Sequence, residues 1–237
     1  MNRLVILPLL VGFAACDAPS SVETITIEGA VSNLKVKSGD GDVELTPGEG
    51  DTVSVEVTLT GRGTKFSYEF KDGELTLKKR CGLGLGVCET DFRIVAPSNV
   101  PAEIQTKSGA ISVTEWEGPL DLSTSSGNIE VDVCSGNLIM DSGSGMITGK
   151  EISSNHVAVL GGSGDVELDV VEKDFEDLLV ESGSGDVIVY LPGTGAYNIT
   201  TDSSSGQVFT NNVTTSSNST AIVEVSTGSG DITIQGQ

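Results

Sequence analysis

Basic residues are scarce in this 237-residue sequence. It contains 13 Lys and Arg residues against 34 Asp and Glu residues, which gives a formal net charge of −21 at pH 7. So few cations cannot neutralise a row of phosphates, which excludes nucleic acid as a partner. The negative charge also opposes adsorption to anionic lipid headgroups, and its simplest role is to keep an exported protein soluble.

Histidine and aromatic residues are scarce as well. His156 is the only histidine, and aromatic residues make up 4% of the chain. A single imidazole excludes histidine-rich metal centres and argues against a catalytic dyad. A polysaccharide-active β-helix enzyme is only a remote alternative, since such enzymes need acids, bases and sugar-stacking aromatic rings in one place. No catalytic residue, metal or cofactor is predicted.

Long apolar runs are also lacking, and the one short run lies at the N-terminus. Arg3 precedes the apolar stretch Leu4–Phe13. This stretch is too short to span a bilayer and is typical of a removable export signal. The sequence therefore predicts a secreted protein, and no other segment is apolar enough to cross a membrane.

The residues that follow the apolar stretch resemble the bacterial lipobox. Ala14 and Ala15 lead to Cys16, and in a lipobox the signal is cut before a cysteine that then carries lipid. Residues 1–15 are predicted to be a lipoprotein signal peptide and residues 16–21 a short tether, with the membrane bound through lipid on Cys16. The alternative is an ordinary secretory signal followed by an incidental cysteine.

Glycine, in contrast, is abundant, with 30 residues in the chain, and eight glycines recur in one setting. Seven and five positions before each of them, and two and four positions after it, the residues are apolar in 29 of 32 places. This alternation indicates two short strands per repeat, each with one buried face. The repeat-turn glycines are Gly41, Gly109, Gly127, Gly145, Gly164, Gly185, Gly206 and Gly230.

One repeat cannot bury its apolar stripe, but a stack of repeats buries a continuous column. The expected fold is all-β, a β-solenoid (β-helix) of about seven to eight rungs stacked in sequence order. Residues 22–100 are predicted to hold the first repeat and an antiparallel β-meander that caps it, with a hairpin at Lys71-Asp72-Gly73. Residues 101–237 are predicted to hold the other solenoid repeats, continuous with the preceding region as one domain.

Stacking in sequence order has a consequence for the C-terminal end. It leaves the last strand, within Asp231–Gln237, at the open edge, where unpaired backbone groups favour further pairing. The polar loop Asn211–Thr220 is expected either to fold over this edge or to leave it free for contact with a second copy.

The turns of the repeat have the sequence Ser-Gly-Ser-Gly or a close variant. Glycine is expected there because it tolerates a positive φ. The serines directly before the repeat glycines are expected to form a hydroxyl ladder that satisfies the turn backbone. Asp165 and Asp186 follow repeat glycines on consecutive rungs and are candidate calcium ligands. A solvated turn is the favoured interpretation, because Asn128, Met146 and Gln207 interrupt the column.

Three cysteines follow Cys16. Cys81 and Cys88 are predicted to close a loop through a disulfide, as an oxidising compartment allows. A metal site is the alternative, although zinc-ribbon spacing and a nearby histidine are lacking. Cys134 aligns with Trp116 of the neighbouring repeat, which predicts a buried free thiol.

Several stretches resemble the bacterial putative-adhesin domain family, which is related to the head GIN domain. They are a strand that ends in proline, Phe92–Pro97, and the turn segments Lys107–Ile111, Ser142–Gly145 and Ser182–Val187. The resemblance covers nearly all of residues 22–237. It implies tandem Ser-Gly-Ser-Gly-Asp-Val turns on a β-helix and says little about function beyond the adhesin label.

These observations predict a non-catalytic, lipid-anchored protein of the bacterial cell envelope, facing either the periplasm or the surface. Its solenoid is predicted to be a binding or adhesion scaffold for an unknown protein or glycan. An envelope-stress or regulatory partner protein is the alternative, which the family resemblance permits.

Overall fold

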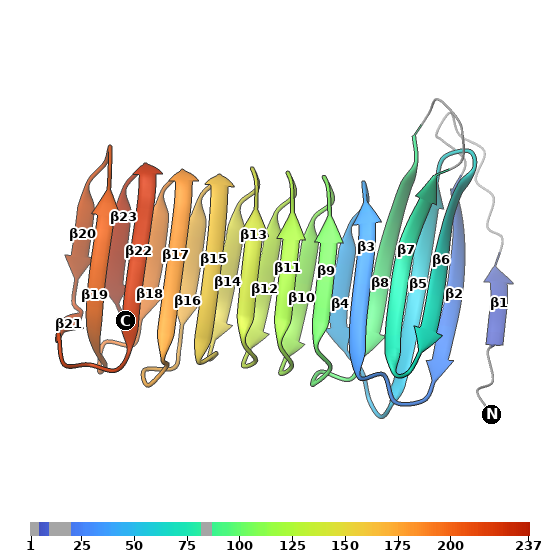
Figure 1. The fold of residues 1–237 in the computed structure, drawn as a ribbon, viewed down its shortest axis with the longest axis horizontal. Helices are drawn as coiled ribbons and strands as arrows, with labels where there is room; N and C mark the ends of the chain where they lie inside the picture. Colours follow the sequence, from blue (N-terminus) through green and yellow to red (C-terminus); the bar gives the residue numbers. More distant parts are fainter. Residues whose placement is uncertain (1–4, 10–19, 82–86) are drawn as a thin grey trace.

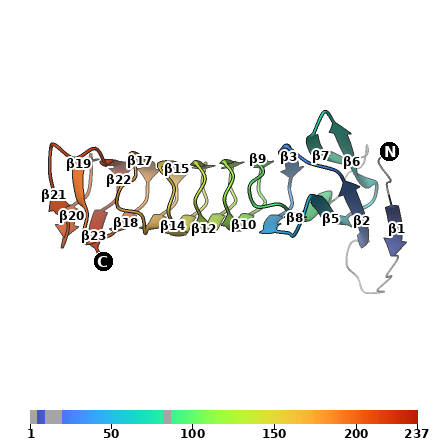
Figure 2. The same ribbon diagram turned by 90° about the horizontal axis from the view of Figure 1, so that it is seen from below.

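A computed structural model describes residues 5–9, 20–81 and 87–237. The described residues form strands, turns and irregular segments without a helix, so the all-β prediction is confirmed. Among them, accordingly, no helix is long and apolar enough to cross a membrane. The strands stack side by side into an elongated body in which two sheets face each other (Figures 1 and 2).

The first sheet, sheet A, has 12 strands in the spatial order β1-β2-β5-β8-β4-β10-β12-β14-β16-β18-β23-β20. Its strands are β1 (Val5–Leu9), β2 (Ser20–Glu28), β4 (Val43–Pro47), β5 (Thr52–Thr60), β8 (Glu89–Ala96), β10 (Ile111–Trp116), β12 (Ile129–Cys134), β14 (Ile147–Ile152), β16 (Val166–Val170), β18 (Val187–Leu191), β20 (Val208–Asn211) and β23 (Ile232–Gly236).

The second sheet, sheet B, has 11 strands in the order β21-β19-β22-β17-β15-β13-β11-β9-β3-β7-β6. Its strands are β3 (Asn33–Gly39), β6 (Thr64–Lys71), β7 (Glu74–Cys81), β9 (Ala102–Thr106), β11 (Leu120–Thr124), β13 (Leu138–Ser142), β15 (His156–Ser163), β17 (Asp177–Ser184), β19 (Ala196–Ser203), β21 (Thr214–Thr215) and β22 (Ile222–Ser229).

Along the middle of the body, a strand of sheet B is followed in the chain by a strand of sheet A, and we call such a pair a rung. Rungs pair in parallel with their neighbours, so that Ile111, Ile129 and Ile147 form one column in sheet A. Along β11, β12 and β13, buried side chains alternate with more exposed ones over most of the strand. The core is therefore a continuous apolar column between the two sheets, as expected for a solenoid-like stack.

The N-terminal region from β2 to β8, which we call the N-terminal cap, contains a rung that the repeat pattern does not reveal. Strand β7 pairs in parallel with β3, and β8 pairs in parallel with β4. Leu75 and Leu77 thus align with inward positions of the first repeat, as do Phe92 and Ile94. The rung lacks the repeat glycine because a longer corner, closed by Cys81 and Cys88, joins its two strands.

The remaining strands of the cap pair antiparallel as predicted, but they do not form one meander, because β6 and β7 lie in sheet B whereas β5 lies between β2 and β8 in sheet A. Strand β6 pairs with β7, β5 with β8, and β2 with β5. The hairpin between β6 and β7 turns at Asp72 and Gly73, whose φ angles are 51° and 83°. Two consecutive positive φ values are those of a type I′ turn, which matches the twist of a two-residue hairpin.

The expected order of the last rungs is wrong. The final strands of the chain, β22 and β23, lie between two other rungs, because β22 pairs with both β17 and β19 and β23 with both β18 and β20. The rung formed by β19 and β20 is therefore the outermost one (Figure 1). After β18 the chain first forms the outermost rung and then returns, so that β22 and β23 lie between that rung and β17 and β18. Its last strand is therefore an interior strand rather than an edge strand.

The polar loop covers part of this outermost rung. Strand β21 pairs with the start of β19 at Ala196 and Tyr197, and Ser219 Oγ donates a hydrogen bond to the Ala196 carbonyl. Strand β20 keeps one unpaired edge, and its side chains Val208 and Phe209 are exposed. The loop thus shields the beginning of the outer rung in sheet B and leaves the edge in sheet A open.

Candidate functional site

The repeat-turn glycines stack directly on one another along the body. A methyl group placed on Gly127 would lie 2.0 Å from the Gly109 carbonyl oxygen, and one on Gly145 would lie 1.8 Å from that of Gly127. Of the eight glycines, only Gly185 and Gly230 have a positive φ in the left-handed or neighbouring range. The expectation that positive φ selects these glycines is therefore wrong for six of them, where the close approach of the neighbouring backbone is the reason.

A hydroxyl ladder is present, but two residues earlier than expected. The serines directly before the repeat glycines are exposed, whereas the residues three positions before them point inward. Thr124 and Ser142 each donate a hydrogen bond to the glycine carbonyl of the preceding rung, Gly109 for the first and Gly127 for the second. These inward hydroxyls satisfy backbone carbonyls of the turns, and Gly109 also accepts a hydrogen bond from Thr106 of its own rung. The exposed serines directly before the glycines do not make these hydrogen bonds.

The candidate calcium ligands act within the turns. Asp165 Oδ1 accepts the Asp186 backbone N–H at 2.9 Å, and Asp186 Oδ1 accepts the Asp231 backbone N–H at 2.8 Å. Asn128 accepts the Met146 backbone N–H at 2.9 Å in the same way. Since an amide serves as well as a carboxylate, the column is explained by turn hydrogen bonds. The described ranges contain no group of three or more His, Cys, Asp or Glu residues placed to hold a metal ion.

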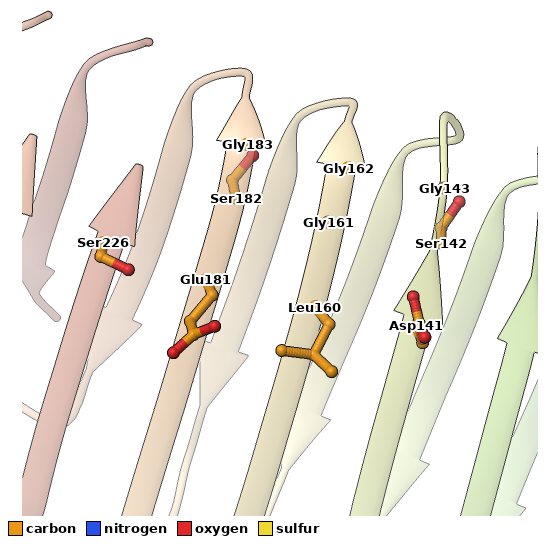
Figure 3. A pocket seen from close by; sticks show the side chains of 10 residues that line it. All are labelled: Asp141, Ser142, Gly143, Leu160, Gly161, Gly162, Glu181, Ser182, Gly183 and Ser226. Carbon is orange, nitrogen blue, oxygen red and sulfur yellow. The ribbon is translucent and has the colours of Figure 1, made fainter. Parts of the chain in front are cut away.

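A shallow open depression lies on the outer face of sheet B near the turns (Figure 3). Its volume is about 430 Å³, and exposed Asp141, Leu160 and Glu181 line it from three adjacent strands. Glycines at the ends of these strands, together with Ser142, Ser182 and Ser226, form the rest of its wall. The depression offers carboxylates and a small apolar contact, but no nucleophile paired with a base.

His156 cannot serve the serines of the turns. It lies at the first residue of β15, whereas the turn begins at Ser163, the last residue of the same strand. Seven residues of extended strand separate the two by about 23 Å. His156 Nδ1 instead pairs with Asp177, whose carboxylate raises the pKa of the imidazole. The only imidazole of the chain is thus held in a surface ion pair.

Trp116 and Cys134 are adjacent in a buried column. Trp116 is 1% exposed and donates its indole N–H to the Val100 carbonyl, so it is not available for stacking on a sugar. Cys134 is a buried free thiol, and burial raises the pKa of its thiol group. A thiol with a raised pKa is rarely ionised and therefore unreactive.

The structure contains a disulfide between Cys81 and Cys88, with a Cα–Cα distance of 6.0 Å. It closes the corner between β7 and β8, at the end of the rungs where the other corners are Ser-Gly turns. Cys16 and most of the predicted signal lie outside the described residues, and Val5–Leu9 forms β1, antiparallel to β2.

The arrangement defines a class of protein: an all-β stack of rungs with close-packed glycine turns and flat polar outer faces. Within this class, the chain belongs to the Toastrack DUF4097 family, which it matches over residues 31–183. The predicted family resemblance is thereby confirmed.

Two solved structures have a similar fold. One is described as a putative adhesin from Bacteroides fragilis NCTC 9343; it is 15% identical with a TM-score of 0.57, and the match covers 90% of this chain and 97% of that chain. The other, a putative adhesin from Parabacteroides distasonis ATCC 8503, is 16% identical with a TM-score of 0.53 and coverage of 91% and 98%. No curated protein matches the sequence. At such identities the likeness establishes the fold alone.

Proposed function

We propose that this protein is a non-catalytic binding scaffold of the bacterial cell envelope, anchored to a membrane through lipid on Cys16. Its solenoid, of the seven to eight rungs predicted from the repeat, presents two flat faces to an extended protein or glycan. The description of two structural neighbours as putative adhesins is consistent with such a role.

The observation that carries the scaffold proposal is a regular polar row on the outer face of sheet A. Register partners along this row alternate between carboxylates and hydroxyls: Glu44, Ser112, Glu130, Thr148 and Glu167. From β4 to β16, carboxylates therefore recur on every second rung, about 9.6 Å apart, and the row ends at Ile188 of β18. A flat array with a constant repeat suits a partner that is itself extended, since one contact can be repeated along its length.

A photo-crosslinking side chain at Glu130 or Thr148 tests the scaffold in intact cells. We expect a light-dependent adduct with one envelope component from both positions, because the two residues are direct register partners. The control carries the same probe at exposed Ser126 in the turn, where we expect no such adduct. An equal adduct from Ser126, or none from either position in sheet A, would contradict a binding face on this row.

The anchoring proposal divides the chain as the sequence predicts. Residues 1–15 are removed as a signal, residues 16–21 connect the lipid to the fold, with Ser20 and Ser21 already part of β2, and residues 22–237 form one domain. Removal of the signal takes β1 away from β2 and leaves β2 at the edge of sheet A. The mature chain then begins at the cap, so the solenoid extends away from its anchor.

Replacing Cys16 by alanine is expected to abolish the lipid-anchored mature form. Without the thiol, neither lipidation nor the cleavage that depends on it takes place, so the chain accumulates as a precursor or appears in the soluble fraction. Fractionation followed by immunoblotting measures this, with Ser20→Ala as the control that leaves the lipobox intact. A mature-sized, fully membrane-bound Cys16→Ala protein would overturn the anchor.

A further inference from the structure

The net charge conceals an uneven distribution along the stack. Residues 101–237 contain 3 Lys and Arg residues against 20 Asp and Glu residues, whereas residues 1–100 contain 10 against 14. Ten of the 13 Lys and Arg residues therefore belong to the N-terminal cap or precede it. The solenoid beyond the cap carries most of the negative charge.

Four of these cations lie together on the outer face of sheet B. Lys65 of β6 is the register partner of Arg80 of β7, and Lys37 of β3 is the register partner of Lys78 of β7. Arg80 and Lys78 are two residues apart on one strand, so all four side chains leave the same face of the sheet. All four are exposed. We call Lys37, Lys65, Lys78 and Arg80 the cationic patch.

The patch is not neutralised by neighbouring carboxylates. Within the described part of the chain, the salt bridges of the cap engage Lys35, Lys79 and Arg93 but none of the four patch residues. Arg80 donates its only side-chain hydrogen bond there to the Ser67 hydroxyl, which is neutral. The four charges are thus available to an anionic partner.

The patch lies at the end of the cap where the chain enters the fold. Ser20, the first residue of β2, pairs with Thr60, whose carbonyl accepts a hydrogen bond from Thr64 at the start of β6. Thr64 in turn pairs with Cys81, directly after Arg80. In Figure 1, β2 and β6 both begin at the end of the strands where β7 finishes. Four residue steps separate Ser20 from Cys16, a reach of at most about 14 Å.

We infer that the cationic patch docks on the phosphate headgroups of an anionic membrane at the site of anchoring, with the acidic rungs directed away from it. This inference rests on the proposed anchor at Cys16, which would hold the patch close to the lipid surface. It departs from the expectation that the net charge prevents adsorption. The strands from β13 onward lie at least three strand spacings from β3, about 14 Å, whereas charges are screened beyond about 10 Å at 0.1 M salt.

The test uses the full chain with Cys16→Ser, so that no lipid contributes to binding. Flotation is measured with vesicles of phosphatidylcholine alone and of two parts phosphatidylcholine to one part phosphatidylglycerol, at low and at physiological salt. The apolar leader is common to all variants, so differences between variants report the patch. We expect stronger binding to the anionic vesicles, weakened by salt.

The patch variant is Lys37→Gln with Lys65→Gln and Lys78→Gln. We expect its partition coefficient to fall by about 100-fold on anionic vesicles, since each cation near such a surface contributes about fivefold. The matched control, Arg93→Gln with Lys150→Gln and Lys173→Gln, changes the net charge equally at residues that form salt bridges elsewhere. Its partition coefficient is expected to stay close to that of the parent.

Equal losses in the two triple variants would show that only net charge matters and would overturn the inference. So would equal binding to the two kinds of vesicle, or full displacement by inorganic phosphate at matched ionic strength, which would indicate a site for soluble phosphate. If the patch variant fails to melt like the parent, exposed Lys65→Glu alone replaces it, with Lys150→Glu as its control. Because the vesicle test needs no lipid on Cys16, its failure is distinct from failure of the anchor.

Discussion

Replacing Gly145 by alanine is expected to destabilise the protein by about 3 kcal/mol or more. The added methyl carbon would lie 1.8 Å from the Gly127 carbonyl oxygen and 2.3 Å from the carbonyl carbon. Both atoms belong to the backbone of the neighbouring rung, which is hydrogen-bonded to rungs on either side and cannot yield alone. Urea unfolding followed by far-UV circular dichroism measures the loss as a lower midpoint.

A substitution at Gly161 is the matched comparison, because it is expected to stabilise the protein rather than destabilise it. It occupies the inward hydroxyl column, where other repeats have Ser or Thr, and a Cβ there would meet nothing closer than 3.5 Å. Ser182 on the next rung has a buried hydroxyl without a hydrogen-bond partner among the described residues. Gly161→Ser is expected to stabilise the protein by about 0.5–1.5 kcal/mol, because it restricts the unfolded chain and offers Ser182 a partner.

The two substitutions separate close backbone approach from turn conformation. If conformational freedom were the reason for the repeat glycines, Gly145→Ala would cost little, because Gly145 does not have a positive φ. A loss below about 1 kcal/mol would therefore refute the stacked-carbonyl explanation, because a Gly→Ala change that meets no clash is expected to stabilise a protein by about 0.5–1 kcal/mol. A destabilised Gly161→Ser variant would show that the hydroxyl column is not completed as proposed.

The repeat predicted the stack but not the reason for its glycines. Spacing identifies which residues recur, and the apolar alternation then identifies the inward face. Whether a glycine is required by its φ or by a neighbour depends on the distance between rungs at the turn, which no single repeat contains. The hydroxyl ladder shows the same limit, since Ser142 and Ser144 are both serines and only the strand register distinguishes the inward one.

The repeat pattern does not reveal the hidden rung of the cap, because the corner of this rung is longer than the corners of the other rungs. Leu77 and Phe92 are 15 residues apart, whereas their register partners Val36 and Val43 are separated by 7. A pattern built on a fixed distance from one glycine cannot find such a rung. Alternation was visible in both strands, and the two cysteines between them marked the corner that joins them.

The net charge of the chain does not reveal the cationic patch, because it sums over residues that lie on different parts of the stack. Lys78, Lys79 and Arg80 form a run of basic residues in the sequence, whereas Lys65 lies 13 residues before that run. The common face of Lys65, Lys78 and Arg80 depends on the pairing of β6 with β7 and of β7 with β3, which includes one parallel contact between distant segments. The candidate lipidation site, in contrast, is a local motif and needed no knowledge of the fold.

The sequence does indicate the order of the last rungs, through the polarity of the inward residues rather than through the spacing of the glycines. Of the three inward positions that are not apolar, two, Thr201 and Thr210, belong to the repeat of Gly206. A rung with polar inward residues is best placed at an end, where one side faces solvent, rather than between two apolar rungs. The structure places this rung outermost and inserts the more apolar rung of β22 and β23 inside it.

Ending the chain after Ala221 is therefore expected to unfold the C-terminal part of the stack. The truncation removes β22 and β23, which separate the outer rung from β17 and β18. The outer rung then loses its partners, and residues 192–221 become sensitive to protease. Docking of that rung directly on β17 would place Thr201 against the apolar column and is disfavoured.

A larger internal deletion is expected to do less damage. Removing residues 194–220 takes away the outer rung and joins the end of β18 to the start of β22 through a short corner. The rung of β22 and β23 keeps its register with β17 and β18, for example Val187 with Ile232. In the deletion variant β22 and β23 form the end of the stack. Strand β22 carries Glu224, and Asp231 lies in the turn between β22 and β23, so this end is charged and resists edge pairing.

Limited proteolysis and thermal melting of the two deletion proteins test the order of the rungs. In the observed order, loss of 222–237 removes an interior rung, so this variant should melt lower and be cleaved more readily than the variant lacking 194–220. In sequence-order stacking, loss of 222–237 would remove only an end rung, whereas the internal deletion would remove an interior one. The ranking of the two variants would then be reversed, and that result would show that the last strand of the chain forms the edge.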